Sequence, residues 1–293
     1  MKYNFIKTNH SSFPVVKMCR VLKCSPSGYY RFEKQPLSKQ KLFNQVLTKR
    51  IKGLYREHKG MVGSPMILGD LRAEETFSTV GKNRVAGIMK KEGLKCKAIK
   101  KYLRTTDSRH REPVAENLLN RNFNVSHPNT VWAGDITYLR IGRKWFYLSI
   151  FIDLYSRIVV GWDLSGSLDS NSTVKALNKA ILRRRPGSGL MIHSDRGIQY
   201  ACNDFRNELK KHNFIQSMSR KGNCWDNAVA ESFFHTFKTQ LIHHERFDDV
   251  MTAEQAIFNY IEIYYNRRRR HSSNDYYSPA DYELKWERDQ KVA

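Results

Sequence analysis

Three acidic residues stand in separate, distinctive contexts: Asp135 in VWAGDITYL, Asp195 in MIHSDRGIQY and Glu231 in WDNAVAESFFHTFK. In the chain, 59 residues separate Asp135 from Asp195, and 35 separate Asp195 from Glu231. Two aspartates and a glutamate that a fold brings together can hold a pair of divalent cations for phosphoryl transfer. Oxygen ligands without His or Cys favour Mg²⁺ or Mn²⁺ over zinc. We therefore expect all three residues to be catalytic residues and metal ligands, with two ions between them.

Each acid also has an ordinary structural interpretation. Asp135 could be a buried structural carboxylate, although Asp is depleted in strands and no local partner is evident. Asp195 could begin a turn, because Asp is common at strand ends. Glu231 could form a surface pair with His235. The three contexts together favour the metal site, and we expect His193 and His235 to pack or support it.

The chain is strongly basic, with a net charge of +23 and a pI of about 9.9. Most of this charge precedes the first acidic motif, because residues 1–120 carry a net +17 and residues 121–293 a net +6. Such a balance indicates a polyanionic partner, most commonly DNA or RNA. The alternative is a basic soluble protein without a nucleic-acid partner.

Other broad classes receive no support from the sequence. No apolar run approaches the roughly 20 residues needed to span a bilayer. The start, MKYNFIKTNH, has no apolar stretch typical of a signal peptide. The five cysteines form no CxxC pair, which is consistent with free thiols in a reducing compartment. We expect a cytoplasmic protein that associates with the nucleoid when it is bound to DNA.

Five regions can be distinguished along the chain. We expect a helical, helix-turn-helix-like region at 1–60, a second helix-turn-helix-like region at 61–96, and a basic linker at 97–127 with a short helix near 116–120. A catalytic core follows at 128–247 and a helical basic tail at 248–293. In the second region, Ser64 is expected to cap one helix, and the next helix carries basic side chains suited to a DNA groove. Its candidate DNA-binding residues are Lys82, Asn83, Arg84, Lys90 and Lys91; the alternative is a solvated charged helix.

The core region predicts an α/β domain. VWAGDITYL, WFYLSIFIDLYS and RIVVGWDL are expected to form three antiparallel strands, with Asp135 on the face opposite Trp132 and Ile136. A helix, a strand ending at Asp195, a helix, a strand and a helix over 227–241 follow. The order βββαβαβα is that of a ribonuclease-H-like domain, with a mixed five-stranded sheet and flanking helices. Parallel strands in such a sheet present their carboxyl ends side by side, where sites are usually built.

Further DNA contacts are expected near Glu231 and in the tail. Asn227, Glu231 and Lys238 share one face of the expected helix, so the amide and the ammonium could contact a bound strand. In the tail, Thr252 and Gln255 resemble a capping box. The basic run after this helix is interpreted as a phosphate-binding strip or, alternatively, as a solvated run; it consists of Arg267, Arg268, Arg269 and Arg270.

Together these motifs resemble the second-reading-frame (OrfB) transposases of the IS-three family of insertion sequences, within the DDE transposase and retroviral integrase superfamily. The resemblance is carried by MCRVLKCSPSGYY, GSPMILGDLR, FIDLYSRIVVGW, HSDRGIQY, SRKGNCWDNAVAESFFHTFK and YNRRRRHSSNDYYSPADYE, which occur in that order. It implies that Asp135, Asp195 and Glu231 form the metal-binding triad. It also implies that Lys238, seven positions after Glu231, contacts transposon-end DNA.

The resemblance implies hydrolysis of one strand at a transposon end, followed by attack of the freed 3′-OH on another phosphodiester. It further implies double-stranded terminal repeats and target DNA as partners, and an upstream-frame (OrfA) protein or frameshift fusion. Because two ends must be handled together, we expect a homo-oligomer on DNA. Two alternatives stay open: a ribonuclease-H-like nuclease that only hydrolyses, and a catalytically inactive DNA-binding regulator.

Overall fold

The computed structural model describes residues 2–34, 38–96, 112–221 and 223–292. The chain divides into two compact units, Met1–Leu54 and Tyr55–Ala293. This division does not test the domain boundaries expected at 60/61, 96/97, 127/128 and 247/248. They stay predictions.

The first unit is helical. It holds α1 (Lys2–Asn9), α2 (Val15–Val21), α3 (Pro26–Lys34) and most of α4 (Lys39–Glu57). A small core of Ile6, Met18, Cys19 and Tyr29 joins the first three helices. The Ser25 hydroxyl accepts a hydrogen bond from the Gly28 amide at 3.3 Å, the contact that an N-cap serine makes at the start of a helix. Gln35 and Pro36, where the sequence predicts a break between helices, lie outside the described residues.

The second unit begins with a helix pair, α5 (Ser64–Arg72) and α6 (Lys82–Lys91), joined through a short 3₁₀ turn, η1 (Glu75–Phe77). The expectation that Ser64 caps α5 is wrong, because Gly63 has the extended backbone of the N-cap and Ser64 is already helical. After α6, Gly93 adopts a positive φ of 68°, the left-handed conformation that commonly closes a helix.

A five-stranded mixed sheet forms the centre of the second unit. Its strands are β1 (Val131–Ile141), β2 (Lys144–Asp153), β3 (Val159–Ser165), β4 (Met191–Ser194) and β5 (Ile215–Met218). The spatial order is β3-β2-β1-β4-β5, with β1, β2 and β3 antiparallel and β1, β4 and β5 parallel. This is the sheet of a ribonuclease-H-like fold, as the order of elements predicted.

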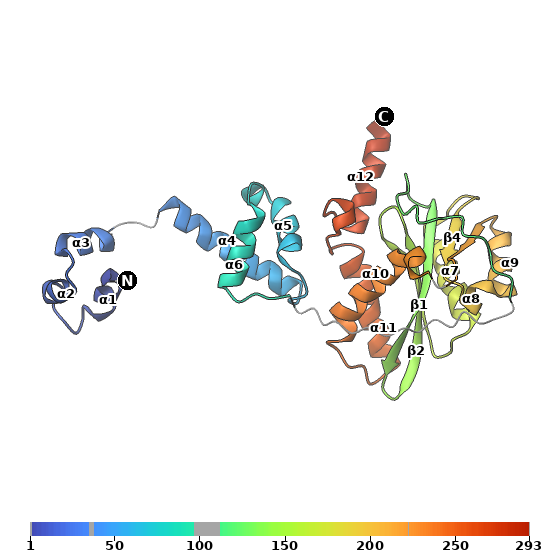
Figure 1. The fold of residues 1–293 in the computed structure, drawn as a ribbon, viewed down its shortest axis with the longest axis horizontal. Coiled ribbons are helices and arrows are strands. Elements are labelled where there is room, and N and C mark those ends of the chain that lie inside the picture. The colour runs from blue at the N-terminus through green and yellow to red at the C-terminus, as the bar shows by residue number, and fades with distance from the viewer. Residues whose placement is uncertain (1, 35–37, 97–111, 222, 293) are drawn as a thin grey trace. The chain divides into compact units, whose positions relative to one another are not determined.

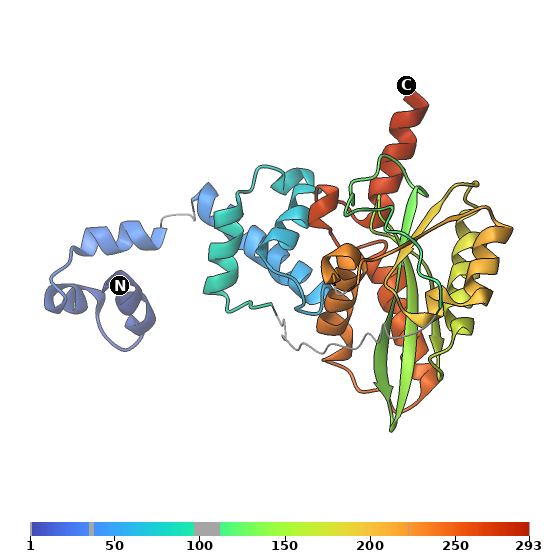
Figure 2. The ribbon, with the colours of Figure 1, turned by 45° about the vertical axis from the view of Figure 1, so that its right-hand side comes forward.

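Helices cover both faces of this sheet (Figures 1 and 2). On one face, α7 (Ser170–Arg184), α8 (Ile198–Ala201) and α9 (Asn203–Lys211) pack around Trp132 and Phe151. On the other face, α10 (Ala228–Phe237) and α11 (Val250–Phe258) pack against Leu139 and Leu148. The remaining elements are η2 (Cys224–Asn227), η3 (Lys238–Ile242), η4 (Asn259–Tyr265), η5 (Ser272–Asn274) and α12 (Pro279–Val292). Because both faces are covered, the face that carries Asp135 is as apolar as the one opposite.

Three local expectations are corrected by the structure. The helix expected over 227–241 consists of the 3₁₀ turn η2, the α-helix α10 and the π-helix η3. The helix expected near 116–120 is a turn, because Asn120 and Arg121 both have positive φ and the Asn117 side chain accepts from the Asn120 amide. Helix α11 is capped by Asp249, whose carboxylate accepts from the Thr252 amide at 2.8 Å, and not by Thr252.

Candidate active site

Asp135 lies in β1, and Asp195 directly follows the neighbouring parallel strand β4. In the β1–β4 register, Gly134 is opposite Ser194, the last residue of β4, and in each segment the next residue is the aspartate. Adjacent strands are about 4.8 Å apart in the hydrogen-bonding direction. The backbone pairing therefore brings together two carboxylates that are separated by 59 residues in the chain.

Both carboxylates accept hydrogen bonds from nearby backbone amides. Asp135 Oδ1 accepts from the Ile136 amide at 2.9 Å, and Asp195 Oδ1 accepts from the Gly197 amide at 2.9 Å. Burial raises the pKa of Asp135 well above its usual range, and the neighbouring charges of Asp195 and then Glu231 raise it further. A divalent cation would relieve this mutual repulsion.

The backbone of β1 approaches aromatic rings closely just before Asp135. A Cβ on Gly134 would lie 2.7 Å from Phe151 and 3.1 Å from Tyr200, so this position requires glycine. The buried Tyr200 ring lies close to both aspartates. Burial raises the pKa of its hydroxyl well above the usual value, and the negative charges of Asp135 and Asp195 raise it further. Close packing of these rings against Gly134 holds β1 in place on this face of the sheet.

Glu231 comes to the same region on α10. Its neighbours Ala230, Phe233, Phe234 and Phe237 are buried in the core that includes Leu139 of β1, whereas Glu231 itself is exposed. Burial of its carboxyl and the charge of Asp195 raise the pKa of Glu231. The helix therefore places a third carboxylate within electrostatic range of the strand pair.

Lys238 is half-buried at the start of η3. Burial lowers the pKa of its ammonium group, while the charge of Asp135 raises it; in turn, Lys238 lowers the pKa of Asp135. The predicted DNA-binding lysine thus lies close to the acids.

Asn227 does not lie on an exposed face with Glu231. It is buried, and its Nδ2 donates to the Gly134 carbonyl oxygen at 3.2 Å; its contact with DNA stays a prediction. The physical reason for its burial is the 3₁₀ geometry of η2, which directs Asn227 toward β1. Asn227 therefore connects the start of α10 to the residue that precedes Asp135.

Asp226 is the centre of a hydrogen-bond network that the sequence did not reveal. It is buried and accepts five hydrogen bonds, from Asn117 Nδ2, Arg121 Nε and the amide, Nε and Nη2 of Arg220, at 2.8–3.0 Å. These donors, with Arg220 the strongest, hold the pKa of Asp226 well below its usual range. Because Arg121 lies 105 positions away, no local spacing could have indicated this network.

The two histidines differ in environment. His193 is buried between β4 and β5, where Nδ1 lies 2.9 Å from Ser217 Oγ and Nε2 lies 3.3 Å from Ser219 Oγ. Burial lowers the pKa of His193 to about 4, so the ring is neutral at pH 7. His193 thus packs between these strands, as expected; His235 is exposed.

The three acids fit divalent-cation chemistry by type and by charge. However, no group of three His, Cys, Asp or Glu side chains is arranged to hold a metal ion within residues 2–34, 38–96, 112–221 and 223–292. Asp135 and Asp195 are instead turned toward backbone amides. The structure therefore brings the acids into one neighbourhood without forming a complete ligand set.

The expected DNA-binding residues of α6 lie mostly on its outer side. Val85 and Met89 are buried, whereas Lys82, Asn83, Lys90 and Lys91 are exposed. Arg84 is partly buried.

The run of four arginines divides into two pairs. Arg267 and Arg268 are exposed. Arg269 donates through Nε to Gln240 Oε1 at 3.1 Å, and Arg270 donates through Nε to Asp70 Oδ1 at 2.8 Å. Two members of the expected phosphate-binding strip therefore also bind the protein itself, and the strip stays a prediction.

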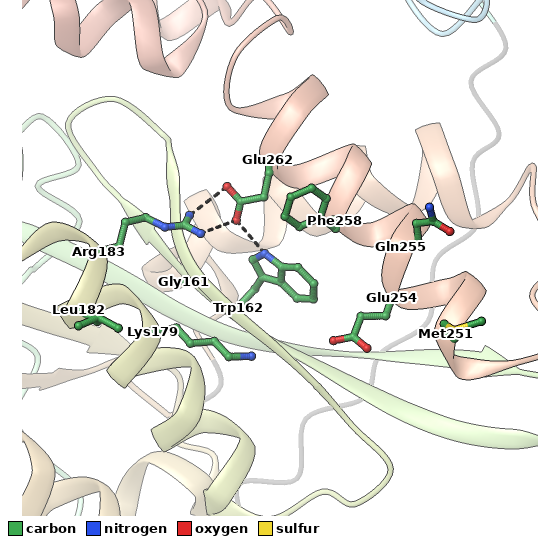
Figure 3. A pocket seen from close by; sticks show the side chains of 10 residues that line it. All are labelled: Gly161, Trp162, Lys179, Leu182, Arg183, Met251, Glu254, Gln255, Phe258 and Glu262. Atoms are coloured by element: carbon green, nitrogen blue, oxygen red, sulfur yellow. Dashed lines mark hydrogen bonds and ion pairs between the residues drawn. The ribbon is translucent and has the colours of Figure 1, made fainter.

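A groove of about 650 Å³ lies at the edge of the sheet, between β3, α7, α11 and η4 (Figure 3). Within it, Arg183 Nη2 lies 2.8 Å from Glu262 Oε1, to which Trp162 Nε1 also donates at 2.9 Å. The edge strand β3 is separated from β4 by two other strands, so this groove is not part of the acidic site.

Two family models described as "Integrase core domain" match residues 125–224 and 231–286, and one described as "HTH-like domain" matches residues 43–102. The transposase InsF of insertion sequence IS3A from Escherichia coli strain K12 is 40% identical over 287 residues, which cover 97% of this chain and 99% of that protein. The chain belongs to the IS3 family of insertion-sequence transposases. Its second unit accordingly contains the integrase core of a DDE-type transposase.

Other comparisons extend to a second element and to solved structures. The IS600 uncharacterized 31 kDa protein of Shigella sonnei is 39% identical over 269 residues, which cover 92% of this chain and 98% of that protein. The catalytic core of HTLV-2 integrase, solved in complex with magnesium, is 16% identical, with a TM-score of 0.40 over 54% of this chain and 97% of that chain. An IS3-family transposase with a helix-turn-helix-like domain acts on DNA.

No helix in the described part of the chain is both long and apolar enough to cross a membrane.

Proposed function

We propose that Asp135, Asp195 and Glu231 carry out the transposase chemistry: cleavage of one strand at each transposon end, then transfer of the 3′-OH into DNA. The observation that carries this proposal is the β1–β4 register, which sets Asp135 beside Asp195. The dependence of both the Asp135 and the Glu231 pKa on the Asp195 charge supports Glu231 as the third member.

These carboxylates would hold Mg²⁺ or Mn²⁺, and two ions are proposed. Bound there, such ions would activate the attacking water or 3′-hydroxyl and stabilise the leaving oxygen. The pairing of β1 with β4 positions the carboxylates of Asp135 and Asp195. Glu231 has an exposed side chain that can rotate toward them. Lys238 supplies a positive charge close to Asp135, suited to a DNA phosphate.

A strand-transfer assay tests this function. The protein is incubated with the labelled ends of its own element, target DNA and Mg²⁺, and joined products are measured. We expect joining by the wild type and its loss, by roughly a thousandfold or more, in Asp195→Asn, with end binding unchanged within a few fold. Normal joining by Asp195→Asn would contradict the assignment of this residue.

The same assay distinguishes the two alternative functions. Cleavage without joining would favour a ribonuclease-H-like nuclease. Binding with neither reaction, even with the upstream-frame protein supplied, would favour an inactive regulator. We propose that the reaction uses a homo-oligomer and the upstream-frame (OrfA) segment, because two DNA ends have to be handled together.

We propose that the exposed basic residues of α6 and of the tail contact DNA phosphates. The double variant Arg267→Ala with Arg268→Ala is expected to weaken DNA binding and to reduce the salt slope of log K by up to about two. Arg270→Ala is the matched control, because Arg270 is bound to Asp70 and its loss should lower stability more than the salt slope. An unchanged slope in the double variant would remove the tail from the DNA interface.

A further inference from the structure

Trp225 is the most exposed tryptophan of the chain, with 69% of its surface accessible. It lies in η2, directly before two buried residues, Asp226 and Asn227. A large aromatic side chain at such a position would ordinarily bury its apolar surface. We therefore consider how the surrounding loop keeps this side chain exposed.

The two residues that follow Trp225 both anchor the backbone of this loop. Asp226 accepts five hydrogen bonds from Asn117, Arg121 and Arg220, and Asn227 donates to the Gly134 carbonyl oxygen. With both of these side chains directed inward, Trp225 is presented outward. The loop thus carries an exposed ring on a backbone that is anchored close to Gly134 in the chain's fold.

The residues that anchor this loop carry positive charge. Arg121 and Arg220 together contribute two charges against the single carboxylate of Asp226, and their side chains remain 44% and 47% exposed. A guanidinium group has five N–H donors in a planar fork, so each arginine can bind Asp226 and still present donors to a phosphate. Lys221, also exposed, adds a further positive charge.

The ring is also close to the reacting residues along the backbone. Asn227, two positions after Trp225, contacts the residue that precedes Asp135. Glu231 follows Trp225 by six positions, in the first turns of α10. Trp225 therefore lies close enough in the chain to the acidic residues for one DNA strand to be able to contact both.

We propose that Trp225, with Arg121 and Arg220, forms a nucleotide subsite that binds an unpaired base of the DNA end. This proposal rests on the transposase function proposed above. The indole stacks on the base, and the two guanidinium groups contact the adjacent phosphates. Aromatic–base stacking accepts any base, because every base has a π-face. The subsite stabilises an end whose last bases are separated, which allows the scissile phosphate to reach the acids.

The test uses two end duplexes with Ca²⁺ in place of Mg²⁺, to prevent cleavage: one fully paired, and one with mismatched terminal bases that carry 2-aminopurine. For the mismatched end, Trp225→Ala is expected to lose roughly tenfold or more in affinity and to lose the quenching of 2-aminopurine, while Trp225→Phe retains most of both. Trp145→Ala is the matched control, because Trp145 is 52% exposed on β2, two strands from β4 in the sheet order.

The outcomes separate this subsite from the proposed function. Equal binding of mismatched ends by Trp225→Ala and wild type would overturn the subsite, and so would an equal loss of affinity for paired and mismatched ends. Joining assays in Mg²⁺ are run in parallel. If the wild type joins ends while Trp225→Ala behaves like it on both duplexes, the subsite fails and the transposase chemistry stands; if the wild type joins no end, the proposed chemistry fails first.

Discussion

The two aspartates and the glutamate of the acidic site are held in different ways. Asp135 lies in β1 and Asp195 directly follows β4, so the pairing of these two strands brings the aspartates close together. Glu231 belongs to a helix whose position depends on side chains: the phenylalanines beneath it, Asn227 at its start and the Asp226 network before it. Backbone pairing supports two of the acids, and a network of side chains supports the third.

This difference predicts where the site is most easily disturbed. A sheet position changes only when strands separate or slip, whereas a helix can shift slightly when one supporting contact is lost. An error of about 1 Å in the position of a reacting group can cost roughly a hundredfold in rate. We therefore expect substitutions on the helix side to reduce activity more than stability, and substitutions on the strand side to reduce stability first.

Among substitutions outside the three acids, the largest effect is expected from Asp226→Ala. Without this carboxylate, Arg121 and Arg220 lose their shared acceptor, and the start of α10 is released. The joining rate should fall by roughly a hundredfold, and the Mg²⁺ concentration that gives half-maximal joining should rise. Asp249→Ala, which removes the cap of α11, is the control and should leave both quantities near the wild-type values. An unchanged Mg²⁺ requirement in Asp226→Ala would show that Asp226 does not position Glu231.

The next effect is expected from Gly134→Ala. The added methyl group would lie 2.7 Å from Phe151 and 3.1 Å from Tyr200, both packed behind the strand pair. Overpacking of this kind typically lowers the free energy of unfolding by about 1–3 kcal/mol. Gly187→Ala serves as the control, since no atom lies within 4 Å of a Cβ built there. Denaturant titration measures both variants, and equal stabilities would contradict the close packing behind Asp135.

The smallest effect is a change in pH dependence. The pKa of Asp226 is lowered, mainly by hydrogen bonds from Arg220, so its contribution to stability is present above the unfolded value near 4 and is lost as pH falls below it. Wild type should therefore be more stable than Asp226→Asn at pH 7, with the difference shrinking below about pH 4. Chemical denaturation at several pH values measures this, and a constant difference would show that the Asp226 charge is not the stabilising feature.

The strand-borne part of the site could be predicted from the sequence. Three strands followed by a helix and a strand ending at Asp195 define one sheet, and in such a sheet the ends of parallel strands meet. The family resemblance, confirmed by relatives of about 40% identity over nearly the whole chain, carries the same arrangement. The assignment of Asp135, Asp195 and Glu231 as catalytic residues stays a prediction.

Contacts between side chains far apart in the chain could not be predicted. The run of arginines has uniform chemistry in the sequence, yet Arg270 binds Asp70, 200 positions away, while Arg267 is exposed. Likewise, the spacing of Asn227 and Glu231 predicts that they share one face of a helix. In the structure Asn227 belongs to a 3₁₀ turn and contacts Gly134 of β1. Periodicity describes one element at a time, and these residues are placed by packing between elements.

The most direct test of the shared acidic site is divalent-cation binding. Calorimetric titration of Mn²⁺ into the protein bound to paired end DNA compares wild type with Asp135→Asn, Asp195→Asn and Glu231→Gln. Each substitution is expected to weaken Mn²⁺ binding by roughly tenfold or more, because all three carboxylates serve one site. Wild-type Mn²⁺ affinity in Glu231→Gln would contradict the claim that the helix-borne acid joins the strand-borne pair.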